Sequence, residues 1–256
     1  MTTRTKQDDF IDEGMRLLEE AEKQDIILRV MGAIAIRHHC PDFRELHQKM
    51  GREISDIDYV GYEKQSDEIE DFFKEQGYKS RVLSYSYRQV GRMIFFDEAT
   101  KRHVDVFLDK LAMCHTIDFS DRLEIDYPTI PLAEILLQKT QIIMLSDKDV
   151  IDTMVMFREH DVGASDEDMI NIDYIAGILA RDWGFYHTVT TNLQKVKDLL
   201  PDYYLLTDED RQIIADRIDR TITRFEEEPK RLKWKIRSKI GTRMKWYKDV
   251  YSAPKE

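Results

Sequence analysis

The sequence contains two cysteines among its 256 residues, Cys40 and Cys114, which is too few for a disulfide framework and favours a reducing compartment. Ten glycines and six prolines exclude collagen-like and low-complexity chains. No apolar run approaches the roughly 18 residues of a membrane span. The first ten residues also lack the apolar segment of a secretory signal. We therefore expect a cytoplasmic protein that has no membrane partner.

Charge, in contrast, is abundant. Charged residues make up 35% of the chain, and 50 acidic against 39 basic side chains give a net charge of −11. Residues 230–248 contain nine Lys or Arg and no acid, which leaves −20 for the rest. An acidic body argues against a protein that coats nucleic acid, whereas the basic segment permits a local contact.

The pattern of apolar residues changes near Pro128. Before it, segments rich in Ile, Val, Phe and Tyr are bounded by charged or turn residues, as strands are. The predicted strands are Ile26–Gly32, Ile57–Gly61, Arg92–Asp97 and His103–Leu108. The predicted helices between them are Asp9–Lys23 and Ser66–Gln76, the second capped by Ser66 and ended by Gly77. Strands interleaved with helices indicate an α/β or α+β layer architecture over residues 1–128.

After Pro128 the strand signals fade, and a helical domain is predicted over residues 129–256. Its predicted helices are Pro131–Gln141, Asp147–Glu159, Asp166–Asp182, Val189–Leu200 and Asp208–Glu228. Ser165 and Thr207 precede acidic first turns and are predicted N-caps.

The final segment, Lys230–Lys248, is predicted to be a basic amphipathic helix. Its apolar residues stand four apart: Leu232, Ile236, Ile240 and Met244. The favoured interpretation is that this stripe docks on the body of the protein. The alternatives are that Trp234, Trp246 and their basic neighbours contact RNA, or that the helix meets an anionic membrane surface.

Two carboxylates stand close together in Asp56-Ile57-Asp58. Side chains alternate across a strand, so both project from one face, roughly 7 Å apart. Such carboxylates repel one another unless a cation lies between them, and Mg²⁺ prefers hard oxygen ligands. The alternative is a charged strand end that faces water.

Two further features bear on this choice. Gly32-Ala33 follows an apolar strand and opens a helical pattern, where a glycine lets backbone N–H groups approach an anionic ligand. Asp105 interrupts an apolar strand, where a carboxylate is costly to bury without a partner. If the strands that carry Asp58 and Asp105 are neighbours, three carboxylates converge and can hold two divalent ions for an in-line phosphoryl displacement.

On these residues the chain resembles the nucleotidyltransferase-fold superfamily, related to DNA polymerase beta, over roughly residues 26–157. The resemblance implies an α+β fold, with a mixed sheet and flanking helices over residues 1–128 and a helical domain after it. The family pattern is a Gly-Ser or Gly-Gly turn, a strand with Asp-x-Asp, and a third Asp on a later strand. The matching positions here are Gly32-Ala33, Asp56-Ile57-Asp58 and Asp105. Ala33 departs from the pattern because it lacks the hydroxyl of the usual Ser, and the separation of Gly32 from Asp56 is longer than most members show.

A second likeness lies further along the chain. Residues 131–139 followed by 147–152 resemble the Lys-containing helix and the Lys-Asp-x-x-Asp segment of abortive-infection toxins and related uncharacterised nucleotidyltransferases. By this resemblance Lys139 would neutralise triphosphate charge; a surface lysine is the alternative. Asp149 and Asp152 would orient it or would lie on a solvated face. The resemblance to toxins also introduces the hypothesis that an antitoxin partner neutralises the protein.

Four histidines and the two cysteines form no metal-binding motif, because their spacing matches no zinc site. They are His38, His39, Cys40, His103, Cys114 and His115.

Together, residues and resemblance predict a transferase that moves a nucleoside monophosphate from a nucleoside triphosphate to an acceptor and releases pyrophosphate. Asp56, Asp58 and Asp105 would be catalytic and would bind Mg²⁺ or Mn²⁺, while Gly32, Ala33 and Lys139 would bind the nucleotide. The acceptor would be an RNA end, a protein hydroxyl or a small molecule such as an aminoglycoside. The alternative is a module of the same fold that binds nucleotide or a partner without turnover.

Overall fold

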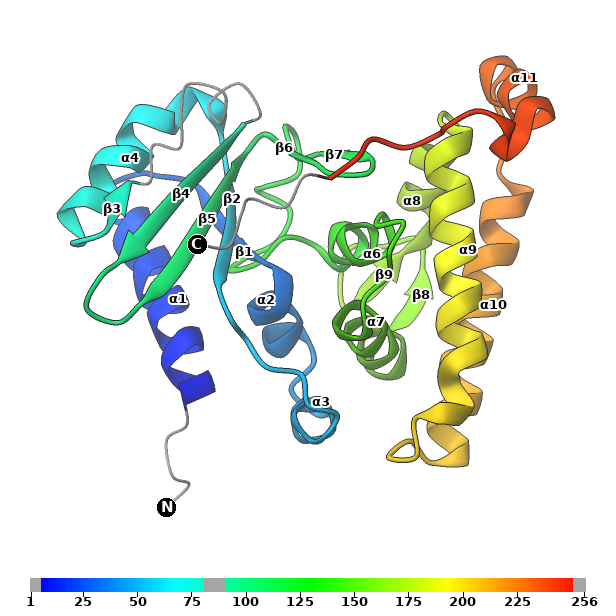
Figure 1. Ribbon diagram of the computed structural model, residues 1–256, viewed down its shortest axis with the longest axis horizontal. Coiled ribbons are helices and arrows are strands. Elements are labelled where there is room, and N and C mark those ends of the chain that lie inside the picture. Colours follow the sequence, from blue (N-terminus) through cyan, green and yellow to red (C-terminus); the bar gives the residue numbers. More distant parts are fainter. Residues whose placement is uncertain (1–5, 81–90, 251–256) are drawn as a thin grey trace. The chain divides into compact units, whose positions relative to one another are not determined.

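The computed structural model describes residues 6–80 and 91–250, and its chain divides into two compact units (Figure 1). Unit 1 consists of residues 1–41, 51–111 and 117–131. Unit 2 consists of residues 42–50, 112–116 and 132–256. Each unit therefore includes segments that are separated in the sequence.

A five-stranded mixed sheet forms the centre of unit 1, in the order β1-β2-β5-β4-β3. Its strands are β1 (Leu28–Met31), β2 (Ile57–Gly61), β3 (Lys79–Ser80), β4 (Arg92–Asp97) and β5 (Arg102–Leu108). Strands β2 and β5 are parallel, and the other pairs are antiparallel. The helical elements of this unit are α1 (Lys6–Glu22), α2 (Gly32–His39), η1 (Glu63–Gln65) and α4 (Ser66–Glu75). Mixed α+β architecture is confirmed.

Helices α1 and α4 bury one face of this sheet. Tyr59 of β2 is fully buried, and its hydroxyl donates to the Gly14 carbonyl of α1 at 2.6 Å. Phe73 of α4 stacks on Phe95 of β4 with ring centroids 4.3 Å apart. Because side chains alternate along a strand, the residues next to Tyr59 face the other side of the sheet. That side carries the acidic residues described below.

Helix α4 begins at Ser66, but no side chain caps it, so the predicted Ser66 cap is wrong. Its predicted end is confirmed: the helix stops at Glu75, and Gly77 follows with a φ of +86°, a backbone conformation that glycine adopts without strain.

Unit 2 is mainly helical. Its helices are α3 (Arg44–Lys49), α6 (Leu132–Thr140), α7 (Asp147–Glu159), α8 (Ile172–Leu179), α9 (Trp183–Leu199), η2 (Leu200–Asp202), α10 (Asp208–Glu227), α11 (Leu232–Ile240) and η3 (Gly241–Arg243). A two-stranded parallel sheet of β8 (Asp161–Gly163) and β9 (Met169–Asn171) lies among them. Helices α9 and α10 run side by side (Figure 1). Two further short strands, β6 (Lys110–Ala112) and β7 (Thr116–Asp118), pair with each other.

Two predictions for this half of the chain are wrong. The helix predicted over 166–182 is replaced by β9 and α8, and α9 begins only at Trp183. Its predicted cap, Ser165, caps no helix; instead Asn171 caps α8 and Asp182 caps α9 through their side-chain oxygens. Thr207 does cap α10, as predicted.

The predicted docking of the C-terminal apolar stripe is also wrong. Helix α11 ends at Ile240 because Gly241 follows with a φ of +60°, so Met244 lies beyond the helix. Leu232, Ile236 and Met244 are exposed by 74%, 57% and 61%. Within the described residues, no helix has the length and apolar character needed to cross a membrane.

Candidate metal centre

The acidic constellation of unit 1 is built by two neighbouring parallel strands. The register of β2 and β5 places Asp58 directly beside Asp105. Asp56 precedes the first residue of β2 and therefore projects near the same strand end. One carboxylate oxygen from each of the three residues lies within 4.8 Å of the others. The structure thus brings together the three carboxylates named from the sequence.

The three carboxylates differ in their exposure. Asp56 is exposed and accepts a hydrogen bond from the Ser55 hydroxyl at 3.1 Å. Asp58 is half-buried, and Asp105 is 8% exposed. The cluster therefore runs from the buried Asp105 to the exposed Asp56 at the strand end.

Gly32 lies against Asp58. Strand β1 pairs with β2 so that Met31 is opposite Asp58, and α2 begins at the next residue. Gly32 has a φ of +70°, and a Cβ atom there would stand 2.6 Å from Asp58 Oδ2. Both facts require glycine at this position. Ala33 follows in the first turn of α2, so backbone N–H groups of a helix N-terminus begin beside the carboxylates.

The donor set fits a hard divalent cation. Mg²⁺ binds oxygen at about 2.0–2.1 Å, so two ligands on opposite sides of one ion are about 4.2 Å apart. Oxygens that already lie within 4.8 Å reach that spacing by small side-chain rotations. Three like charges so close together also need positive charge to offset their repulsion.

Arg92, at the start of β4, supplies part of that charge and was missed by the sequence analysis. Its Nη2 lies 2.6 Å from Asp105 Oδ2, and its Nε donates to Oδ1 at 3.2 Å. The guanidinium also lies over the Phe107 ring at 5.1 Å. Ile94 of β4 lies opposite Asp105, and alternation along β4 puts Arg92 on the same face as Ile94. The contact between Arg92 and Asp105 can therefore be predicted only when the register of β4 and β5 is known.

Lys139 belongs to unit 2, on α6, whereas the three carboxylates and Gly32 belong to unit 1. Its side chain is 8% exposed, so the surface interpretation is wrong. Lys139 Nζ lies 2.7 Å from Asp152 Oδ2 and 3.5 Å from Asp149 Oδ1. Asp152 is fully buried and also lies 2.7 Å from His47 Nε2, so a solvated face is wrong for Asp152 as well.

The histidines serve hydrogen bonding. His39 Nε2 lies 2.6 Å from the Thr129 hydroxyl. His115 lies 2.8 Å from the Thr188 hydroxyl and stacks on Phe185, and burial lowers the pKa of His115 to about 4. Within residues 6–80 and 91–250, no group of histidines and cysteines is arranged to hold a metal.

Comparisons with known proteins add little to this geometry. No family model and no curated protein matches the sequence. The solution structure of the antibiotic-resistance factor ANT(2'')-Ia matches with 11% identity, covering 93% of this chain and 100% of that one, at a TM-score of 0.36. A likeness at this level does not establish a common family, and the centre is therefore interpreted from its own residues.

Proposed function

We propose that the chain is a metal-dependent nucleotidyltransferase. It would transfer a nucleoside monophosphate from a nucleoside triphosphate to an acceptor and release pyrophosphate. The observation that carries this proposal is the convergence of Asp56, Asp58 and Asp105 within 4.8 Å beside the Gly32 turn. Paired carboxylates at a strand end, next to a helix N-terminus, combine cation binding with phosphate binding.

Each residue then has a distinct part in the proposed reaction. Asp56 and Asp58 would hold Mg²⁺ or Mn²⁺, which when bound supplies the positive charge that stabilises a triphosphate in transfer. The N–H groups at the start of α2, at Gly32 and Ala33, would orient the phosphates. An acceptor oxygen would form a bond to the α-phosphorus as the bond to the bridging oxygen of pyrophosphate breaks. Asp105 would take the proton of the acceptor hydroxyl.

The contacts of Lys139 suit a different part. A lysine buried between Asp149 and Asp152 has its charge already matched within unit 2. We propose that Lys139 and Asp152 support the fold of α6 and α7, with nucleotide binding by Lys139 as the alternative that the resemblance raises. A Lys139→Gln variant separates the two by its Michaelis constant for the nucleotide, which rises only if Lys139 contacts it.

The proposal is tested by incubating the full chain with each α-labelled nucleoside triphosphate, Mg²⁺ and three acceptor pools: RNA, protein extract and aminoglycosides. We expect label in one pool, and Asp58→Asn should lower its rate by at least about a hundredfold because the variant removes a cation ligand. The matched control is Asp121→Asn, which alters an exposed acid of unit 1 outside the cluster. Equal incorporation by Asp58→Asn and the unaltered protein would contradict the proposed centre.

One observation favours the alternative of a binding module without turnover. Arg92 makes two contacts to Asp105, so a fixed cation already occupies one side of the third carboxylate. In that case nucleotide would bind without transfer. Isothermal titration separates the two functions: binding without label incorporation in any pool would favour the module, and an Arg92→Gln variant that gains incorporation would show that Arg92 blocks the reaction.

A further inference from the structure

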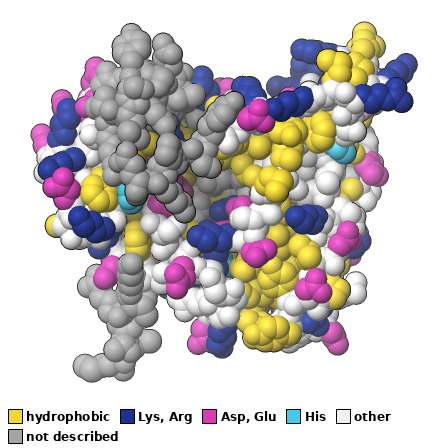
Figure 2. All heavy atoms as spheres, viewed as in Figure 1, with side chains coloured by type: hydrophobic (Ala, Val, Ile, Leu, Met, Phe, Trp, Pro, Cys, Tyr) yellow, Lys and Arg dark blue, Asp and Glu magenta, His cyan; other side chains and the backbone are white. Residues whose placement is uncertain are grey.

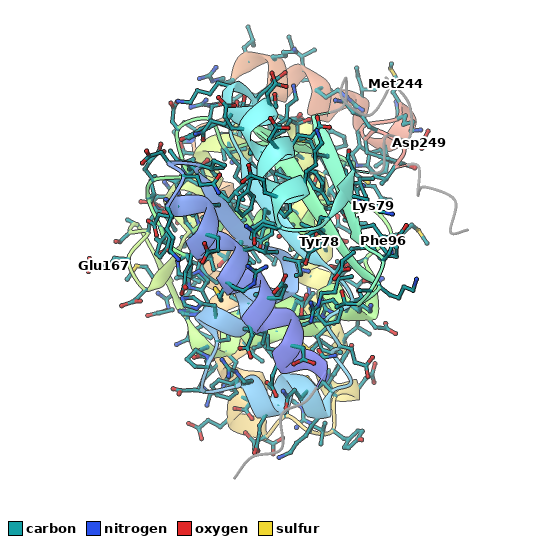
Figure 3. All side chains as sticks on the ribbon, turned by 90° about the vertical axis from the view of Figure 1, so that its left-hand side faces the viewer. Tyr78, Lys79, Phe96, Glu167, Met244 and Asp249 are labelled. Carbon is teal, nitrogen blue, oxygen red and sulfur yellow. The ribbon has the colours of Figure 1, made fainter. Side chains whose placement is uncertain are left out.

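Helix α11 and the segment after it present a surface of aliphatic and basic side chains, here named the α11 face. Its aliphatic members are Leu232, Ile236 and Met244, exposed by 74%, 57% and 61%. Its basic members are the exposed residues Lys233, Lys235, Lys239 and Arg243. Figure 2 shows Lys and Arg atoms gathered with hydrophobic atoms over α11, at the upper right. Met244 projects from the ribbon there (Figure 3).

The aromatic side chains of this segment point the other way, into unit 2. Trp234 meets the edge of Tyr186 with ring centroids 5.3 Å apart. Trp246 donates its indole N–H to the Thr188 hydroxyl at 3.1 Å. A Cβ atom on Gly184 would stand 2.6 Å from the Trp246 carbonyl oxygen, so the backbone approaches α9 closely. The indoles are therefore engaged by the protein itself.

One cationic side chain and two backbone contacts complete the anchorage. Arg237 lies over the Trp183 ring at 4.7 Å and donates to the Gly241 carbonyl at 2.6 Å. The Arg231 N–H donates to the Ala180 carbonyl at 3.2 Å, and the Lys248 N–H donates to the Cys114 carbonyl at 3.0 Å. The segment is thus held at both ends, and the exposure of Leu232 and Ile236 is built into the fold.

This arrangement discriminates among the ligands of a basic surface. Single-stranded RNA is bound by aromatic rings that stack on bases, together with cations that follow the backbone. Here both tryptophans pack on protein, and the outward side chains that accompany the lysines are aliphatic. Aliphatic side chains flanked by lysines suit a lipid interface, where carbon enters the acyl boundary and ammonium groups meet anionic headgroups.

We propose that the α11 face binds anionic membrane surfaces. Leu232, Ile236 and Met244 would enter the headgroup region, and the four exposed cations of this face would meet the lipid charge. The chain outside residues 230–248 carries −20, so an anionic bilayer repels it on average, which favours approach through the α11 face. Such binding lies on the surface and requires no spanning helix.

The test is flotation of the full chain with vesicles of phosphatidylcholine alone and of phosphatidylcholine mixed with phosphatidylserine. We expect binding to the mixed vesicles only, weakened by salt. Each lysine near an anionic surface contributes about a fivefold change in partitioning, so Lys235→Gln/Lys239→Gln should lower it roughly 30-fold. Leu232→Ser/Ile236→Ser should lower it by at least tenfold, because it removes the carbon that enters the headgroups.

Matched controls alter the same residue types elsewhere on the surface. Lys49→Gln/Lys195→Gln removes two exposed lysines, and Met144→Ser removes an aliphatic side chain that is 84% exposed. Neither should change partitioning, and thermal melts confirm that every variant is folded. Absence of binding to the mixed vesicles overturns the proposal. So does undiminished binding by the Leu232→Ser/Ile236→Ser variant, which would reveal charge adsorption alone, or preferential binding of a polyuridine oligonucleotide that displaces the vesicles.

Discussion

At the scale of single residues, the centre depends on how little space surrounds Asp58. Gly32 leaves the Asp58 carboxylate in contact with the start of α2, at a φ of +70° that other residues rarely adopt. The turn and the carboxylate therefore constrain each other: neither can change without displacing its neighbour. Substitution of Gly32 is therefore a sensitive test of the centre, although the sequence alone gives only a weak signal for this glycine.

Gly32→Ala should both destabilise the protein and disable the centre. The new Cβ would stand 2.6 Å from Asp58 Oδ2, and the φ is unfavourable for alanine, so a loss of about 1–3 kcal/mol is expected. Urea unfolding and label incorporation measure the two effects. The control is Gly177→Ala in α8, where a Cβ meets no atom within 4 Å and helix propensity should add up to about 1 kcal/mol. Equal stability of the two variants would contradict the close contact.

His115 should make stability depend on pH. Burial lowers its pKa from 6.5 to about 4 in the folded protein, so the unfolded chain binds more protons between these values. The free energy of unfolding is therefore highest above pH 6.5, where His115 is neutral in both states. It falls by up to about 3 kcal/mol as the pH is lowered toward 4.

Urea unfolding at pH 7 and pH 5 measures this contribution. His115→Gln cannot titrate at this position, and it should show a smaller difference between the two pH values than the unaltered protein. His187→Gln provides a comparison at a second histidine whose pKa burial lowers. If the His115→Gln variant and the unaltered protein show the same difference in stability between pH 7 and pH 5, His115 is not its source.

At the scale of elements, capping decides where the helices of unit 2 begin. Helix α10 has a full capping box: the Thr207 hydroxyl accepts from the Asp210 N–H at 3.1 Å, and Asp210 Oδ2 accepts from the Thr207 N–H at 2.9 Å. Asp210 also pairs with Arg158 of α7, so this start of a helix is joined to its neighbour.

Thr207→Ala should therefore cost about 1 kcal/mol of unfolding free energy, with a range of about 0.5–2, because an N-terminal N–H group loses its acceptor. Thermal or urea unfolding detects this change. The control, Thr191→Ala, alters an exposed threonine inside α9 and should be neutral or slightly stabilising. A neutral Thr207→Ala would mean that water replaces the cap without loss.

Elements with strong local signals could be predicted from the sequence. Strands 57–61 and 92–97 and helix 147–159 have the predicted bounds, because their apolar periodicity and flanking charges agree. Strands β8 and β9 have three residues each, too few to show a period; β8 lies between two predicted helices, and β9 lies within the helix predicted over 166–182. The stripe of α11 has the predicted spacing, but its burial is decided by Trp234 and Trp246, which found partners on α9.

The candidate centre shows the same division. Asp56 and Asp58 stand two residues apart at the start of β2, so their shared face follows from the local pattern, whereas Gly32 meets Asp58 only through the pairing of β1 with β2. The contact of Arg92 with Asp105 depends on the antiparallel register of β4 and β5, and the burial of Lys139 depends on two carboxylates of α7. No sequence period encodes either pairing.

At the scale of the whole molecule, the two units are not simply the parts of the chain on either side of the change in composition at Pro128. Residues 42–50 and 112–116 belong to unit 2, although both precede Pro128. Near that proline, the Val30 N–H donates to the Pro128 carbonyl, and the Ile130 N–H donates to the Val30 carbonyl, both at 3.0 Å. Strand β1 therefore takes backbone partners from both sides of residue 128.

A fragment of residues 1–128 should not fold cooperatively. It lacks Ile130, whose backbone N–H donates to the Val30 carbonyl of β1. It also lacks Asp152, so the buried His47 side chain loses this hydrogen-bond partner, and the loss of a buried polar contact is destabilising. Near-UV circular dichroism and thermal melting of the fragment, alone and co-expressed with residues 129–256, measure this. Co-expression should restore the transition of the intact chain. A sharp transition in the isolated fragment would contradict the shared architecture.

Because α3 belongs to unit 2, its packing also depends on the order in which the chain is synthesised. His47 and Asp152 are 105 residues apart in sequence, yet they form one buried contact. During synthesis α3 and the strand that follows it leave the ribosome long before α7 exists. A six-residue helix is too short to persist alone, so its native packing waits for most of the chain. Helix α3 is thus translated early but packs late, only once Asp152 of α7 has been synthesised.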